Sequence, residues 1–186
     1  MNIIAIVGAR PQFIKHFPIE MCFKKHKYAL KTIHTGQHYD ENMSEIFFTQ
    51  LGMNKPDYML NIDNSSHATQ TASMMLQIEN ILIDENPDGI ILYGDTNSTL
   101  AGAITASKLS IPIFHIEAGL RSFNKEMPEE INRVLTDHIS SILFTPSDIS
   151  IKNLKSEGIV KNVINVGDIM KELLIYVVES KLIKKK

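Results

Sequence analysis

The chain of 186 residues contains a single cysteine, Cys22, which excludes an intramolecular disulfide and any metal site built from several cysteines. It also has no apolar run near the roughly 20 residues that a membrane span requires. The run after Met1 stops at Gly8, which is too short for a secretory signal. We therefore expect a soluble protein of the reducing cytoplasm with no membrane partner.

No charge of one sign dominates the sequence. Nineteen basic and twenty-one acidic residues give a formal net charge of -2, and the lysines are scattered except for the last three residues. A protein that tracks phosphate backbones usually gathers its lysines and arginines in a stripe or patch. The sequence therefore argues against nucleic acid as a partner.

Two phosphate-binding fingerprints are also missing. The chain has neither G-x-G-x-x-G nor G-x-x-x-x-G-K-[ST], which mark dinucleotide sites and P-loops. NAD is therefore not indicated, and we expect no cofactor.

Short β-rich runs alternate with longer amphipathic segments along the whole chain. We predict strands over 2–8, 28–36, 88–95, 111–117, 141–147 and 162–168, and helices over 11–25, 41–52, 66–87, 99–110, 128–139, 149–159 and 170–182. Strands separated by helices of this length are typical of a parallel sheet with right-handed crossovers. The pattern predicts an α/β fold with a Rossmann-like, doubly wound parallel sheet, and the absence of internal repeats favours one domain.

Ligands of such sheets bind at the carboxyl ends of the strands, where loops and helix N-termini meet. After the first strand, Arg10 and Lys15 lie at the start of the helix opened by Pro11. Two cations beside free N–H groups at the positive end of a helix would suit an anion such as a pyrophosphate. The alternative, that both are solvated surface cations, stays open.

Two other strand ends carry polar residues. Asp95 follows the strand over 88–95, where it could equally be a helix cap, and Gln37, His38 and Asp40 follow the second strand. A His-x-Asp pair without a third ligand is weak evidence for a metal, so we expect no metal and interpret Gln37 and His38 as substrate contacts. A signalling receiver domain also has an aspartate at a strand end, but it needs acidic residues where this chain has the basic loop "GARP".

The stretch "HIEAGLRSFNKEMPEEINR" gathers charge after the strand over 111–117. It places Glu117 at the strand end and Arg121 beyond the flexible Gly119. In the helix after Pro128, apolar spacing predicts a buried face made of Ile131, Val134, Leu135, His138 and Ile139. The same spacing directs Glu129, Asn132 and Thr136 toward a shared cleft.

Five motifs in order, "GARPQFIK", "TGQHYD", "YGDTNST", "HIEAGLRS" and "PEEINR", resemble the non-hydrolysing UDP-N-acetylglucosamine 2-epimerase family. The resemblance implies one lobe of a glycosyltransferase B type two-lobe architecture. Residues 1–167 would form the Rossmann-like N-terminal lobe and 168–186 the linker helix with its lysine tail. The second lobe has no counterpart in this chain, so it would be supplied by a removed segment or by a complementary chain.

The resemblance also implies a reaction, in which UDP is eliminated across carbons 1 and 2 of the sugar and added back on the other face. Asp95, Glu117 and Glu129 match the carboxylates of proton transfer and sugar positioning. Residues matching the substrate-binding positions are Arg10 and Lys15 on the phosphate side, with Gln37, His38, Arg121, Asn132 and Arg133. Such an isomerase serves polysaccharide biosynthesis.

Three further expectations follow from the resemblance. The family loop has Thr and Glu where this chain has Ala9 and Gln12, a variant similar to the branch that acts on UDP-2,3-diacetamido uronic acids. A non-catalytic nucleotide-sugar-binding or assembly module is the alternative from another class. We also expect a homo-oligomer, formed through an apolar stripe on the last helix that comprises Met170, Leu173, Leu174, Val177 and Val178.

Overall fold

The computed structural model describes residues 1–37, 52–62 and 66–179. Its strands are β1 (Asn2–Val7), β2 (Ala29–His34), β3 (Tyr58–Met59), β4 (Gly89–Tyr93), β5 (Ile113–Ile116), β6 (Ile142–Thr145) and β7 (Val163–Asn165). Its helices are α1 (Arg10–His26), α3 (His67–Glu85), α4 (Asn97–Lys108), α5 (Pro128–Ile139), α6 (Asp148–Ser156) and α7 (Ile169–Glu179). The helix predicted over 41–52 falls, except for Gly52, outside the described residues.

The seven strands form one parallel sheet in the order β3-β2-β1-β4-β5-β6-β7. The chain adds β2 and β3 on one side of β1 and then β4 to β7 on the other side. This change in the order of strands confirms the predicted doubly wound α/β fold. Strand β3 was not predicted, because its two residues are too few to show an alternating pattern. It pairs with the end of β2, where Ile33 lies opposite Tyr58.

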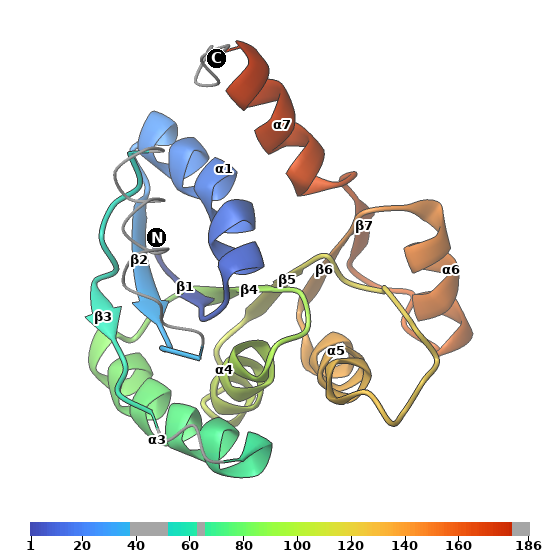
Figure 1. The fold of residues 1–186 in the computed structure, drawn as a ribbon, viewed down its shortest axis with the longest axis horizontal. Helices are drawn as coiled ribbons and strands as arrows, with labels where there is room; N and C mark the ends of the chain where they lie inside the picture. Colours follow the sequence, from blue (N-terminus) through green and yellow to red (C-terminus); the bar gives the residue numbers. More distant parts are fainter. Residues whose placement is uncertain (38–51, 63–65, 180–186) are drawn as a thin grey trace.

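The core has two layers because successive side chains of a strand point to opposite faces. In β1, Ile4 and Ile6 pack with residues of α3 and α4, whereas Ile3, Ala5 and Val7 pack with residues of α1. Figure 1 shows α3, α4 and α5 on one side of the sheet and α1 and α7 on the other. Both faces are covered, which explains why the central strands read as continuous apolar runs.

Parallel pairing brings the carboxyl ends of the central strands to one edge. Tyr93 at the end of β4 lies opposite Ile116 at the end of β5, and Thr35 after β2 donates its backbone N–H to Val7. The loops that begin with Gly8, Gly94 and Glu117 therefore leave the sheet side by side. This edge is where the rule for open α/β sheets predicts a ligand.

The prediction of which face of α5 is buried is wrong. Ile131 and Leu135 are 47% and 45% exposed, Ile139 and His138 are also exposed, and Val134 is half-buried. The residues that α5 buries against the molecule are polar, namely Glu130, Asn132, Thr136 and Asp137. The apolar spacing therefore predicted the wrong face of α5 as buried. The polar face is the inner one because it finds hydrogen-bonding partners on neighbouring loops.

Helix α7 lies against α1, with the rings of Phe17 and Tyr176 5.4 Å apart. Leu173 packs on the core layer of α1, but Leu174 and Val178 are each 61% exposed. This confirms that part of the apolar stripe of the last helix faces solvent. In the described part of the chain, no helix combines the length and the apolar character needed to cross a bilayer.

Candidate functional site

The centre of the carboxyl edge is an ion pair between Lys15 and Glu117. Lys15 reaches from the second turn of α1, and Glu117 is the first residue after β5. Their side chains are 11% and 23% exposed, so the pair is largely shielded yet open on one side. Glu117 has φ +72°, a left-handed conformation that is costly for a residue with a side chain. Such strain is concentrated at functional sites.

Gly94 leaves room for this pair. It also lies in the left-handed region, with φ +62°, and a Cβ added there would lie 3.2 Å from Glu117 Oε2 and 3.6 Å from Lys15 Nζ. Its backbone N–H donates to the carbonyl of Ile116 at 3.0 Å, which ties the end of β4 to the end of β5. Asp95 follows Gly94 directly in the chain.

Asp95 is held from α5. Its carboxylate pairs with Arg133, and its backbone carbonyl accepts a 2.9 Å hydrogen bond from Asn132 Nδ2. Asn132 also donates to Asn97 Oδ1 at 3.2 Å, at the start of α4. Of the predicted site residues, the structure thus joins Asp95, Asn132 and Arg133 through direct contacts.

The two glutamates at the start of α5 differ in their surroundings. Glu130 is buried and accepts hydrogen bonds from the backbone N–H groups of Ser122 and Phe123, each at 2.9 Å. Burial alone would raise the pKa of Glu130, but these hydrogen bonds and the charge of Arg133 outweigh it and hold the pKa below its usual value. Glu129 is exposed. Glu130 therefore holds the loop that contains Ser122 and Phe123, whereas Glu129 is exposed to solvent.

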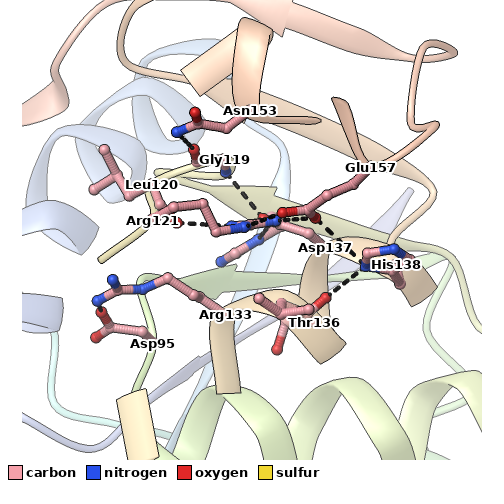
Figure 2. Close-up of polar contacts among 12 residues, drawn as sticks. Asp95, Gly119, Leu120, Arg121, Arg133, Thr136, Asp137, His138, Asn153 and Glu157 are labelled. Carbon is pink, nitrogen blue, oxygen red and sulfur yellow. Dashed lines mark hydrogen bonds and ion pairs between the residues drawn. The ribbon is translucent and has the colours of Figure 1, made fainter. Parts of the chain in front are cut away.

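Arg121 lies in a separate cluster, shown in Figure 2. Its side chain is buried and donates to both carboxylate oxygens of Glu157 and to Asp137 Oδ2, each at 2.7 Å. Asp137 Oδ1 in turn lies 2.7 Å from His115 Nδ1, and the other ring nitrogen of His115 lies 2.8 Å from the carbonyl of Gly94. The guanidinium of Arg121 is thus engaged by protein carboxylates, and its role as a substrate contact stays a prediction.

The carboxylate of Asp137 in this cluster is ionised at neutral pH. Burial by itself would raise the pKa of Asp137, but the hydrogen bond from His115 and the charge of Arg121 leave it below its usual value. The same carboxylate accepts the backbone N–H of Gly119 at 3.0 Å. The cluster therefore fixes the loop after Glu117 from one side and the carbonyl of Gly94 from the other.

Two further predicted residues, Arg10 and Gln37, lie at helix N-termini. Arg10 is the first residue of α1 and is exposed. Gln37 Oε1 accepts from the backbone N–H of Ser98 at 3.0 Å and from its hydroxyl at 2.6 Å, so it covers the N-terminus of α4. His38 and Asp40 lie outside the described residues.

A cavity of about 390 Å³ opens beside Glu117. Its walls come from α1, from the ends of β5 and β6, and from the turn before α7. Most of the lining is apolar, including Ile19, Ile116 and Phe144, with Asp168 and Glu172 at the far side. This size and lining are typical of pockets that hold small molecules.

Sequence reasoning did not single out Gly94, His115 or Asp137. Gly94 could have been found from its place between a buried strand and a polar cap, where a turn requires a positive φ. His115 and Asp137 are 22 residues apart, and only the packing of α5 on β5 brings them together. Among the described residues, no three His, Cys, Asp or Glu side chains are grouped so that they could hold a metal ion.

Comparison with known proteins places this geometry in a family. The profile of the UDP-N-acetylglucosamine 2-epimerase family matches residues 21–186. A Methanococcus maripaludis protein named as a homolog of that enzyme is 55% identical over all of this chain and 51% of its own length. A Pseudomonas aeruginosa protein named UDP-2,3-diacetamido-2,3-dideoxy-D-glucuronate 2-epimerase is 52% identical over 95% of this chain and 51% of its own length.

Solved structures agree with the sequence comparison. The Methanocaldococcus jannaschii UDP-GlcNAc 2-epimerase in complex with UDP-GlcNAc and UDP superposes with a TM-score of 0.95 at 46% identity. This chain is covered completely, together with 51% of that chain. The Neisseria meningitidis enzyme bound to UDP-GlcNAc superposes with a TM-score of 0.91 at 34% identity, over 99% of this chain and 50% of its own. The chain thus spans about half the length of the relatives that it matches.

Proposed function

The chain belongs to the UDP-N-acetylglucosamine 2-epimerase family, and we propose from this that it forms the N-terminal half of a UDP-sugar 2-epimerase. In this proposal, residues 1–167 are the N-terminal lobe and 168–186 are the linker. The complete site would form when a second lobe closes over the carboxyl edge of the sheet. The proposed reaction converts UDP-N-acetylglucosamine to UDP-N-acetylmannosamine.

The observation that carries this proposal is the Lys15–Glu117 pair above Gly94, with Asp95 in the next position. Carbon 2 of the sugar has no neighbouring carbonyl to acidify its proton, so direct inversion would be slow. Elimination of UDP gives a glycal, and re-addition on the other face inverts the centre. This route needs a carboxylate to move the proton and cations beside the departing diphosphate, which the pair and its surroundings offer.

We assign roles on the same grounds. Lys15 and the exposed Arg10 would bind the diphosphate at the start of α1, where the helix dipole also favours an anion. Asp95, Glu117 and Glu129 would provide acid and base groups and position the sugar. Gln37, His38, Asn132 and Arg133 are proposed as supporting substrate contacts. For Arg121 we propose an indirect role through its loop, because Asp137 and Glu157 engage its guanidinium.

Two substrates follow from the relatives. UDP-N-acetylglucosamine is the first, because the M. maripaludis homolog and the superposed structures are named for it. A UDP-2,3-diacetamido uronic acid is the second, because the P. aeruginosa relative is nearly as similar and because Ala9 and Gln12 stand at the start of α1. Competition between the two UDP-sugars in one assay would rank them.

The direct test is exchange of the carbon 2 proton. The chain is mixed with the separately made C-terminal half of the M. maripaludis relative and UDP-N-acetylglucosamine in deuterated water. We expect deuterium at carbon 2 of both epimers. If the two halves associate and no deuterium enters, the chain is instead a binding or assembly module.

We also propose that the chain self-associates in the cytoplasm. The apolar stripe of α7 is exposed in part, at Leu174 and Val178, and a second copy of the chain is its proposed occupant. Sedimentation should show a dimer that Leu174→Glu on α7 disrupts and that Leu135→Glu on α5 preserves. A strict monomer at high concentration would overturn the proposal.

A further inference from the structure

His115 in β5 has an oxygen atom opposite each of its ring nitrogens. Nδ1 lies 2.7 Å from Asp137 Oδ1, and Nε2 lies 2.8 Å from the backbone carbonyl oxygen of Gly94. The side chain has no exposed surface. The carboxyl of Asp137 is ionised at neutral pH, so both oxygens can only accept a hydrogen bond. Each ring nitrogen must therefore supply a proton of its own.

A neutral ring would satisfy only one of these two contacts. Neutral imidazole has one N–H group and one lone pair. One tautomer would place the lone pair against the carboxylate of Asp137, and the other would place it against the carbonyl of Gly94. A buried acceptor left without a donor costs free energy. The geometry therefore favours the imidazolium, with a proton on both nitrogens.

The surrounding charges balance such an imidazolium. Asp137 also pairs with Arg121 at 2.7 Å, and Arg121 donates to both carboxylate oxygens of Glu157. With His115 protonated, this cluster contains two cations and two carboxylates. A neutral ring would leave one carboxylate without a compensating charge in a largely buried place, which is destabilising.

The contact with Gly94 connects this cluster to the candidate site. Gly94 has φ +62°, and a Cβ added to it would lie 3.2 Å from Glu117 Oε2, so its α-carbon borders the Lys15–Glu117 pair. Glycine has more backbone freedom than any other residue, so the peptide after Gly94 needs a hydrogen bond to fix its direction. The carbonyl of Gly94 and the N–H of Asp95 belong to that one planar peptide. The bond from His115 therefore sets how the chain enters Asp95.

We propose that His115 is a positioning residue that carries a proton on both ring nitrogens and fixes the Gly94–Asp95 peptide beside the Lys15–Glu117 pair. It touches neither the substrate nor the reacting atoms and acts through Gly94. Its effect on turnover rests on the proposed function, whereas its protonation and its bond to Gly94 are independent of that function. The other bonds of its cluster maintain the fold.

The first test is the nitrogen NMR spectrum of the histidine rings in the full chain, at neutral pH and without ligand. Protonated and unprotonated ring nitrogens have well-separated chemical shifts. We expect a proton on both nitrogens of His115, whose signals are assigned by their loss in His115→Asn. His16 is the internal control, because burial lowers its pKa to about 4 and one of its nitrogens should lack a proton. An unprotonated nitrogen in His115 would overturn the proposal.

Two amide variants separate the two bonds of the ring. The side-chain N–H of His115→Asn takes the place of Nδ1, so the bond to Asp137 is kept and the bond to Gly94 is lost. The N–H of His115→Gln takes the place of Nε2, so the opposite bond is kept. The backbone N–H of Gly94 donates to the carbonyl of Ile116 at 3.0 Å and reports on this turn.

Hydrogen exchange at the Gly94 amide is measured in both variants. We expect exchange about tenfold faster than wild type in His115→Asn and within about threefold of wild type in His115→Gln, as loss of one buried hydrogen bond implies. The exposed His26→Asn is the control and should match wild type. Equal exchange in His115→Asn and wild type would overturn the proposal.

Turnover with the second half present gives a readout that a merely structural side chain would not produce. We expect kcat to fall about tenfold or more in His115→Asn, with KM changed less than kcat, because a small misplacement of reacting groups is costly. His115→Gln should stay within about threefold of wild type, although it loses the bond to Asp137. A side chain that served only the fold would give no such preference for glutamine over asparagine.

The remaining outcomes are also decisive. Where neither variant folds, the wild-type spectrum decides, because the Nε2 proton of His115 should exchange slowly with water and couple to the carbonyl carbon of Gly94. A rapidly exchanging proton there would overturn the proposal, as would full turnover in His115→Asn. Faster Gly94 exchange in His115→Asn, without turnover in the wild-type mixture, would support the positioning role and overturn the proposed function instead.

Discussion

Two charged clusters flank the end of β5, and they differ in how completely they are satisfied. Arg121, Asp137 and His115 are almost fully buried, and each forms ion pairs or hydrogen bonds in more than one direction. Lys15 and Glu117 pair with each other beside a cavity and remain partly exposed. Both clusters draw on the same stretch, "HIEAGLR", within seven residues.

The contrast separates charges that maintain the fold from charges that are available to a ligand. A buried ion that is engaged on all sides can be removed only at a large cost in stability, and it has no free direction for substrate. A pair that is open to solvent on one side can exchange its partner for a phosphate or a sugar hydroxyl. We therefore expect stability effects from the first cluster and activity effects from the second.

Asp137→Ala tests the first half of the comparison and should have the largest effect. It would leave Arg121 and His115 buried without their shared carboxylate, which costs about 3–5 kcal/mol for a broken buried pair. Urea denaturation measures the loss of unfolding free energy. The exposed Asp84→Ala is the control and should change it by less than about 0.5 kcal/mol. Equal effects at the two positions would remove the distinction between the clusters.

Glu117→Gln tests the second half. We expect the free energy of unfolding to fall by less than in Asp137→Ala, because the Lys15–Glu117 pair is open to solvent on one side. Turnover with the second half present should fall by about 10²–10⁴, the usual loss when an acid or base group is removed. Glu172→Gln, on the α7 side of the same cavity, is the control and should keep most activity. A large stability loss with turnover retained would reverse the assignment.

His16 extends the comparison to a buried group that is neutral. Its ring nitrogens lie 2.8 Å from the hydroxyl of Tyr93 and 3.0 Å from that of Thr32, and burial lowers its pKa from 6.5 to about 4. The unfolded chain therefore takes up a proton below pH 6.5 while the folded one does not. Stability should fall between pH 6.5 and pH 4, by about 3 kcal/mol for this group alone.

Chemical denaturation at pH 7.5, 5.5 and 4.5 checks this slope. Burial also lowers the pKa of His34 to about 4, so His34 contributes in the same direction. His16→Gln should remove roughly half of the loss that the two histidines cause together. An unchanged slope in the variant would show that His16 is not kept neutral by burial.

Gly94→Ala should have a smaller effect on stability than Asp137→Ala and the most local effect on function. The alanine would have to adopt a left-handed φ, which costs about 1–2 kcal/mol of stability, and its Cβ would crowd Glu117 and Lys15. Gly158→Ala is a matched control, because Gly158 has φ +83° and no atom within 4 Å of an added Cβ. Both variants should lose similar stability, but only Gly94→Ala should weaken UDP binding and turnover. Equal activities would mean that the room above Gly94 is not used.

The sequence predicted the sheet and the edge that carries the site, because apolar strand runs and helix spacing are local signals. It placed Asp95 and Glu117 at strand ends and Lys15 one turn into α1; the structure pairs Lys15 with Glu117, and it pairs Asp95 with Arg133. Part of this came from the family motifs, which name positions that spacing alone leaves open.

The errors arose where tertiary contacts override local pattern. The apolar spacing of α5 predicted Ile131 and Leu135 inside, whereas backbone N–H groups in the segment between β5 and α5 bind Glu130 and Asp137 on the inner face. The hydrogen bonds of Gln12 to Tyr93 and Thr96 join residues more than 80 positions apart in the chain, which no local pattern reveals. Long-range polar pairing was therefore the part of the site that the sequence could not provide.

Interconversion of the two UDP-sugar epimers is the most direct measurement of the central claim, that Lys15, Asp95 and Glu117 are half of an epimerase site. The assay compares the chain alone, the chain with a separately made second half, and the same mixture with Glu117→Gln. We predict no turnover in the first, clear turnover in the second and at least a hundredfold loss in the third. Turnover that survives Glu117→Gln undiminished would contradict the account.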